Sequence, residues 1–235
     1  EMGFIQINEQ TRTFERRKGV GIHKWAWLFN PDNSITYMQH NMFLSNDLSF
    51  EQWENRLMVL TADKADAGRT ALLDIEQGIR QKDKLLIAYT PKPNAPKMIE
   101  KAIEVEHSFA PAPWDILLPR IIDLDRSGIY AFSVYDTSRR GLALRTLRNT
   151  GPCQVLIDQR RKPAYKIEDS EGLIPPIHEI YVDDSGRLMR ITTKQLDMVV
   201  TTRQYVDKNY KARVEEALEL FKKHPVPEPA PAQRD

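Results

Sequence analysis

Alternating apolar and polar residues recur along most of this chain, and residues typical of turns separate the alternating runs. The clearest region spans residues 177–204, where Ile180 and Val182 share one side of an extended segment. The following DDSG turn ends in Gly186, which can adopt the positive φ of a tight reversal. Two more extended segments follow, and the second is rich in the β-branched residues that strands favour. This region predicts three consecutive antiparallel strands.

Strands are also predicted in the first half of the chain. The segments concerned alternate or are rich in strand-forming residues, and they span residues 4–8, 14–29, 34–44, 50–61, 69–81 and 84–90. An NPDN turn at residues 30–33 joins the second to the third as a hairpin. Residues 50–61 also fit helical spacing, and we expect a strand at their end. Gly78 indicates a β-bulge.

The second half is predicted to contain further short strands and one helix. The strands fall at residues 129–135, 142–147, 154–157 and 163–167. A helical stripe is formed by Trp114, Leu117, Leu118, Ile121 and Ile122. Pro113 suits the first helical position, and Pro119 should kink the helix. We therefore expect a short buried helix here.

The C-terminal region combines an amphipathic helix with a Pro-rich tail. An apolar stripe predicts a helix over residues 210–224 that docks on the sheet, and it consists of Val214, Ala217, Leu218 and Phe221. Asp207 or Asn209 is its expected cap. Residues 225–235 cannot continue a helix and have little apolar material to bury, so they predict an extended, mobile tail or the start of a linker.

Together these elements predict a mainly β (α+β) fold. We expect a large curved antiparallel meander sheet or half-barrel with a short buried helix and a C-terminal amphipathic helix. Residues 1–209 are predicted to form a single curved antiparallel β domain. The helix at 210–224 and the tail at 225–235 follow it.

Charge and composition make several classes of partner unexpected. Lys and Arg number 34 against 33 for Asp and Glu, and the net charge of +1 gives no global attraction to nucleic acid. The single Cys153 cannot form an internal disulfide and is expected to be structural. No apolar run approaches the roughly 20 residues of a spanning helix. We expect neither a nucleic-acid partner nor a stable membrane span.

The sequence lacks the common motifs of catalytic chemistry. It contains no GxSxG, P-loop or GxGxxG pattern, and its five histidines show no metal-binding spacing. Asp123, Asp125 and Gly128 imitate the start of a calcium loop, but Val134 occupies the position that needs a bidentate Glu. We expect no catalytic residue, no bound metal and no cofactor.

Two groups of residues are candidates for binding. Large aromatic side chains on the N-terminal hairpins can line an apolar pocket with the predicted helix, although core packing is the competing interpretation. This candidate ligand-binding set is Trp25, Trp27, Tyr37, Trp53, Trp114 and Leu118. Basic residues concentrated between 139 and 162 can bind phosphate or an acidic partner. The near-zero net charge favours exposed strand faces for them instead.

A family resemblance adds to this interpretation. The segments WDILLPRI, GIYAFSVYD, PPIHEIYVDDSGRLMRI and MVVTTRQ resemble a broad group of uncharacterised bacterial cell-envelope domains. These are similar in turn to the lipoprotein-carrier folds, in which a curved antiparallel sheet wraps a helix. The likeness covers about two-thirds of the chain and is strongest near Tyr181 and Gly186. It implies export to the periplasm or cell envelope and a hydrophobic ligand, and it implies no catalytic residue.

Three functional hypotheses follow. The leading one is a non-enzymatic cell-envelope domain that binds an apolar ligand, lipid or lipoprotein-like, on the concave face of its sheet. The second is a protein-interaction module that uses sheet edges or the basic stretch at 139–162, and the third is a hydrolase with an unrecognised site. An apolar cavity favours the first, an exposed apolar patch the second, and converging carboxylates or histidines the third. The oligomeric state is not predicted.

Overall fold

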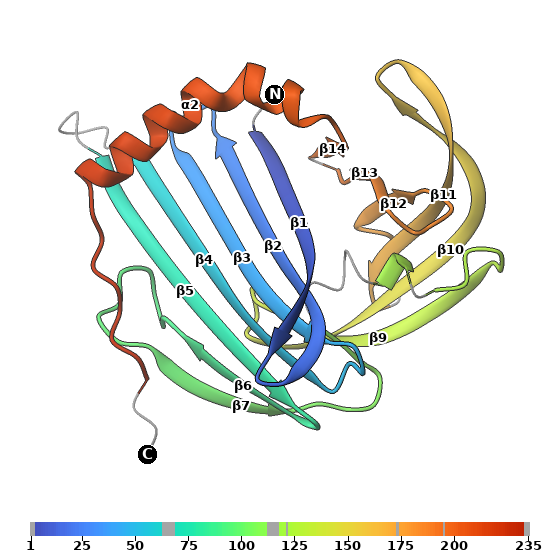
Figure 1. Ribbon diagram of the computed structural model, residues 1–235, viewed down its shortest axis with the longest axis horizontal. Helices are drawn as coiled ribbons and strands as arrows, with labels where there is room; N and C mark the ends of the chain where they lie inside the picture. Colours follow the sequence, from blue (N-terminus) through green and yellow to red (C-terminus); the bar gives the residue numbers. More distant parts are fainter. Residues whose placement is uncertain are drawn as a thin grey trace. The chain divides into compact units, whose positions relative to one another are not determined.

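The computed structural model describes residues 3–62, 69–111, 118–120, 122–172, 174–194 and 196–232. Contacts between Cα atoms divide the chain into two compact units. Residues 1–104 and 203–235 form the first unit, and residues 105–202 form the second. Each unit contains a seven-stranded sheet (Figure 1).

The first sheet is a meander in which each strand pairs antiparallel with the next one along the chain. Its strands are β1 (Gly3–Phe14), β2 (Arg17–Phe29), β3 (Ile35–Ser45), β4 (Phe50–Ala62), β5 (Arg69–Gln81), β6 (Lys84–Tyr89) and β7 (Ile99–Glu104). The predicted NPDN turn joins β2 to β3, where the Asn30 N–H donates to the Ser34 carbonyl at 3.0 Å. Residues 50–61 are extended throughout, because β4 pairs along its length with both neighbours.

The two faces of the first sheet follow from its register and from the two-residue alternation of strands. Trp27 pairs with Phe4 and Tyr37, and Tyr37 pairs with Met58, so these side chains share one face. We call it the helix face, because the C-terminal helix packs on it. Trp53 lies on the opposite face.

Gly78 gives space to a tryptophan rather than forming a bulge. Strands β4 and β5 pair without a register shift, and Gly78 lies directly opposite Trp53. A Cβ atom on Gly78 would come within 2.3 Å of the Trp53 indole, which is 2% exposed. The predicted bulge is therefore wrong, and the glycine is required by the close packing of the ring.

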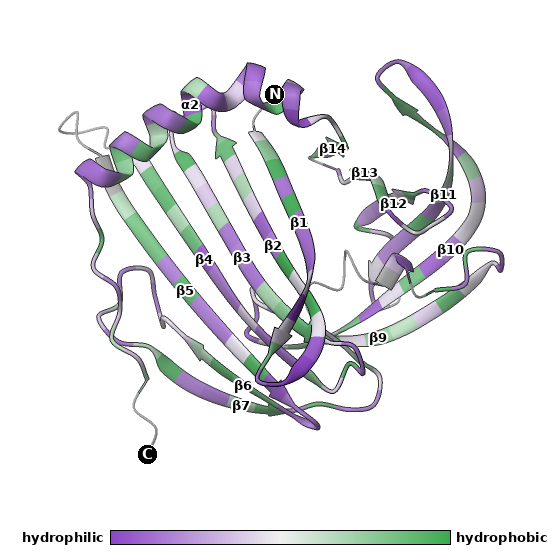
Figure 2. Ribbon diagram, viewed as in Figure 1, coloured by the Kyte–Doolittle hydropathy of each residue, from purple (hydrophilic) through white to green (hydrophobic). Residues whose placement is uncertain are grey.

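The C-terminal helix, α2 (Arg203–Lys223), lies across the ends of β1–β5 (Figure 1). Its buried residues are spaced as one stripe: Tyr210, Ala217 and Phe221. They form one apolar cluster with Trp27, Phe29, Ile35, Leu60 and Ala71. Figure 2 shows apolar residues where β3–β5 approach α2 and polar ones further along the same strands.

The predicted helix is confirmed, but its start and its buried side are corrected. It begins at Arg203, so the expected caps Asp207 and Asn209 lie inside it. Leu218 is 45% exposed and lies outside the buried stripe. The helical turns that precede the predicted start lead into Tyr210, whose ring centroid lies 5.2 Å from that of Phe4. Tertiary packing therefore extends the helix beyond its sequence stripe.

The Pro-rich segment after α2 is extended, as predicted, but it is held against the first unit. The Ala230 N–H donates to the Pro96 carbonyl at 2.8 Å, and the Met98 N–H donates to the Ala230 carbonyl at 3.0 Å. Half-buried residues then recur at every third position, as in a polyproline II helix: Val226, Pro229 and Ala232. These contacts correct the expectation of a mobile tail for residues 226–232.

The second unit contains strands β8 (Phe109–Ala110), β9 (Gly128–Asp136), β10 (Gly141–Ile157), β11 (Arg160–Glu171), β12 (His178–Val182), β13 (Leu188–Thr192) and β14 (Asp197–Val199). Neighbouring strands pair antiparallel, except that β8 runs parallel to β9. The three strands predicted from residues 177–204 are confirmed as β12–β14.

The two short strands predicted at 142–147 and 154–157 form one long strand, β10. Gly151, which suggested a break between them in the sequence, lies inside this strand with a φ of +96°. It forms a β-bulge, because the pairing with β11 shifts register between Asn149 and Gly151. The extra residue of this bulge moves the odd-numbered side chains of β10 from one face of the sheet to the other. Leu147, before the bulge, therefore packs in the main core of the unit, while Val155, after it, joins a separate cluster.

The short helix predicted near residues 114–122 falls mostly outside the described residues and stays a prediction. Within it the structure describes a 3₁₀ turn, η1 (Leu118–Arg120), and Ile122, which is buried in the main core of the second unit.

The mainly β class with a C-terminal helix is confirmed. The single large sheet expected over residues 1–209 is replaced by two seven-stranded sheets in two units.

Replacing Gly78 by Ala should lower the free energy of unfolding by about 1–3 kcal/mol, because the new methyl group overpacks the Trp53 indole. Gly128→Ala is the matched control, since its Cβ atom would lie 3.7 Å from the nearest atom. Chemical denaturation of both variants measures the difference. Equal stability of the two would contradict the packing described for Trp53.

Replacing Gly186 by Val should cost at least about 1 kcal/mol from backbone strain alone, because Gly186 has φ of +74°. A Cβ atom there would also lie 2.6 Å from the Pro119 carbonyl oxygen. Gly172→Val isolates the strain, since φ there is +59° and no atom lies within 4 Å of the added Cβ. Thermal unfolding should show the larger loss at Gly186, and the reverse order would contradict the close approach of η1 to this turn.

Candidate functional site

The aromatic residues proposed as a ligand wall do not share one face of the first sheet. Trp25, Trp27 and Tyr37 lie on the helix face, and Trp53 lies on the opposite face. The Trp27 and Tyr37 rings are 4.5 Å apart, and the Phe221 ring of α2 lies 6.3 Å from Trp27. Trp27 is therefore only 6% exposed, and the protein's own side chains cover it.

Trp25 is half-buried and lies outside the apolar cluster that α2 covers. Its ring stacks on that of His23, with centroids 5.9 Å apart and an interplanar angle of 15°. Trp114 and the side chain of Leu118 lie outside the described residues. Whether any of the set binds a ligand remains a prediction.

A polar row crosses the helix face beyond the cluster under α2. Register places its members side by side on five strands: Asn8, His23, Asn41, Glu54 and Gln77. Figure 2 shows the polar colour of these strands at mid-length. A shallow groove of about 410 Å³ runs over part of this row and is lined by Arg12, His23, Asn41, Gln52, Glu54 and Gln77, among others.

The carboxylate of this row, on Glu54, is paired with an arginine of the neighbouring row, Arg56. Glu54 accepts a hydrogen bond from Arg56 Nε at 2.7 Å and another from Gln77 Nε2 at 2.7 Å. Burial alone would raise the pKa of Glu54, but these bonds outweigh it and hold that pKa below its usual value. Arg56 also donates to Glu228 of the C-terminal segment at 2.6 Å.

The hydrogen bonds of His23 define its tautomer. Arg12 can only donate, and its Nη1 lies 3.2 Å from His23 Nε2, so that nitrogen accepts. The proton therefore sits on Nδ1 and is donated to Asn41 Oδ1 at 2.9 Å. His23 therefore bridges β1 and β3.

The opposite face carries a buried pair of charges. Glu51 and Arg80 are cross-strand partners, and they are 0% and 8% exposed. Their closest charged atoms, Glu51 Oε1 and Arg80 Nε, are 3.6 Å apart. A carboxylate buried this completely needs a cation beside it, so the pair ties β4 to β5.

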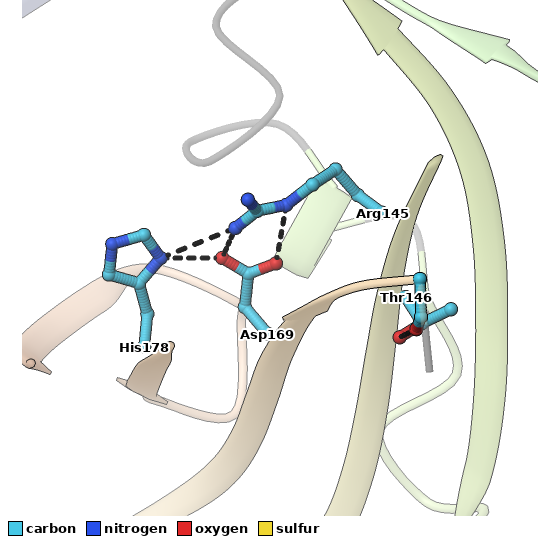
Figure 3. Close-up of polar contacts among 5 residues, drawn as sticks. Arg145, Thr146, Asp169 and His178 are labelled. Atoms are coloured by element: carbon cyan, nitrogen blue, oxygen red, sulfur yellow. Dashed lines mark hydrogen bonds and ion pairs between the residues drawn. The ribbon is translucent and has the colours of Figure 1, made fainter. Parts of the chain in front are cut away.

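In the second unit, sequence reasoning missed a polar cluster formed by Arg145, Asp169 and His178 (Figure 3). Asp169 is 0% exposed and accepts two hydrogen bonds from the Arg145 guanidinium, one of them from Nε at 3.0 Å. His178 Nδ1 lies 2.6 Å from Asp169 Oδ2. The turn after β11 could have indicated this cluster from the sequence, because it pairs Asp169 with His178 on the next strand.

This cluster is a structural tie across β10, β11 and β12. An aspartate that orients a catalytic histidine needs a nucleophile on the far side of the imidazole. Among the residues labelled in Figure 3, the one hydroxyl belongs to Thr146, and it donates to the Gly172 carbonyl at 2.8 Å. The bidentate Arg145 neutralises Asp169, as expected for a buried ion pair.

The basic stretch at 139–162 does not form one surface. Arg145 is buried against Asp169, and Arg139 pairs with Asp136 and Glu171. Arg148 is exposed on β10, whereas Arg160–Lys162 begin β11 beside the hairpin turn. The structure therefore divides the positive charge among separate roles.

The segment that imitates a calcium loop is closed by an asparagine. Asn149 Nδ2 lies 3.1, 2.9 and 2.9 Å from the carbonyl oxygens of Asp123, Leu124 and Arg126. Its amide occupies the centre of these carbonyls. Within the described ranges, no group of three or more His, Cys, Asp or Glu residues is arranged to hold a metal ion.

Across the part of the chain that the structure describes, no helix has the length and apolar character needed to cross a membrane.

Comparisons with known proteins give a fold but no family. No family model matches the chain. No curated protein matches it either. The chain is similar in structure to a β-barrel-like protein of domain of unknown function DUF1849 from Brucella abortus, with a TM-score of 0.54 and 12% sequence identity over 85% of this chain and 86% of that one. This likeness shows a β-rich, β-barrel-like fold.

Proposed function

We propose that the protein is a non-enzymatic cell-envelope domain that binds an apolar ligand, such as the acyl chain of a lipid or lipoprotein. The sequence resemblance to bacterial cell-envelope domains supports this proposal, and the Brucella protein, whose function is unknown, shares the β-rich fold. The proposal places the protein outside the cytoplasm. The ligand surface, however, is moved from the aromatic set to the second unit.

One observation carries this proposal: an apolar strip lies exposed on the outer side of β9 and β10. Leu142 and Leu144 alternate away from the core residue Ala143, and they are 37% and 52% exposed. Register adds Phe109, Ile129 and Ala131 on the same side, where the polar Ser133, Thr146 and Arg148 lie between or beside them. Ile129 is 71% exposed. We call the five apolar residues the β9–β10 strip.

Large apolar side chains exposed on a sheet favour binding, because apolar surface is costly to leave in water. Strand pairing presents the side chains of the strip in rows along the strands. A flexible acyl chain can lie along such rows without a deep cavity. The second hypothesis, a protein-interaction module, uses the same strip for a partner's apolar face.

Replacing Leu144 by Gln should weaken binding of a fluorescent long-chain fatty acid about tenfold, because burial of one leucine side chain contributes about 1.5–3 kcal/mol. Leu86→Gln is the matched control, since Leu86 is 51% exposed on β6 of the first unit. A fluorescence titration measures both.

Absence of saturable probe binding would overturn the apolar-ligand proposal. If the unsubstituted protein instead self-associates in sedimentation experiments and Leu144→Gln abolishes this, the strip serves the interaction-module function.

A further inference from the structure

We propose that the polar part of the helix face binds an uncharged oligosaccharide, independently of the apolar strip. The site is formed by three neighbouring rows of side chains across β1–β5. Seven amide side chains lie in these rows, and we call them the amide band: Gln6, Asn8, Gln10, Gln39, Asn41, Gln52 and Gln77.

The amide band differs from a sheet face that only meets water. Charged residues make up 29% of the whole chain, whereas in these three rows of β1–β5 the charged members are Glu54 and Arg56, which pair with each other. Neutral groups that both donate and accept hydrogen bonds therefore dominate the surface. Arg12, from the next row, reaches over Gly21 and adds one positive charge at the edge of the groove, so an anionic ligand is the competing occupant.

Sugar hydroxyls match this chemistry. Each hydroxyl both donates and accepts, and each planar amide offers a carbonyl oxygen beside an NH₂ group. Adjacent strands lie about 4.8 Å apart, so a row such as Asn8, Asn41 and Gln77 presents polar groups at regular intervals across the sheet. A chain of sugar rings laid across the strands can meet several of these groups.

Trp25 supplies the apolar contact that a sugar ring also requires. It lies between Gln6 and Gln39 in one row, and its ring is half-buried. The stacking on His23 holds the indole in place before a ligand arrives. The C–H groups of a pyranose ring can pack on an aromatic face.

The surface of the amide band contains two shallow depressions. The groove of about 410 Å³ extends over the band toward Phe14, Phe43 and Ile79. A second depression beside it is lined by Ile7, Asn8, Glu9, Gln10, His23 and Trp25. Gly21 leaves room for the Arg12 side chain, because a Cβ atom there would lie 2.3 Å from Arg12 Cδ. An open, elongated depression suits a chain ligand better than a small compact one.

Isothermal titration of the full chain with cellotetraose and chitotetraose tests the proposal, with a heparin fragment as the anionic comparison. We expect at least one neutral tetrasaccharide to bind with a micromolar to millimolar Kd. Trp25→Ala and Gln52→Ala should each weaken binding about fivefold or more. Gln154→Ala, an exposed amide on β10, should leave the affinity unchanged.

Trp25→Ala also removes packing on His23, so its circular dichroism and melting temperature are measured alongside. Gln52→Ala removes a half-buried polar group alone and gives an independent result. Failure of both neutral sugars to bind at millimolar concentration overturns the proposal. So does binding that neither variant weakens, and so does binding of the heparin fragment alone, which would indicate an anion site at Arg12.

Discussion

The packing of α2 on one end of the helix face determines how the first unit can be used. Tyr210, Ala217 and Phe221 cover the apolar end of the face, where Trp27 and Leu60 would otherwise meet water. A helix of this composition gains most of its stability from that docking rather than from its own hydrogen bonds. Because the helix covers only this end, the polar rows further along the strands stay accessible.

Prediction from sequence succeeded where local patterns decide the structure. Alternation and turn residues identified the hairpins, and Gly186 adopts the positive φ expected of its turn. It failed where a distant contact decides. The indole of Trp53 explains Gly78, and nothing near Gly78 in the sequence indicates this. The bulge at Gly151 likewise resembles a break between strands until the pairing with β11 is known.

For the candidate sites too, prediction failed where contacts between distant residues decide the structure. Large aromatic residues were expected to meet in one pocket, but strand register sends Trp53 and Trp27 to opposite faces. Register cannot be obtained from composition, since a shift of one residue exchanges the two faces of a strand. The Arg145–Asp169 pair was hidden in a basic stretch for a similar reason: its partner lies on the next strand, 24 positions away. The β9–β10 strip and the amide band likewise depend on residues brought together by pairing.

Amide hydrogen exchange followed by mass spectrometry tests the central claim, the docking of α2, most directly. If α2 is docked as described, peptides spanning Tyr210–Phe221 should be protected to a similar extent as those of β2–β4, since opening the helix would expose Trp27 and Phe29. Exchange of the helix at the rate of an unfolded peptide, while β2–β4 stay protected, would contradict the account.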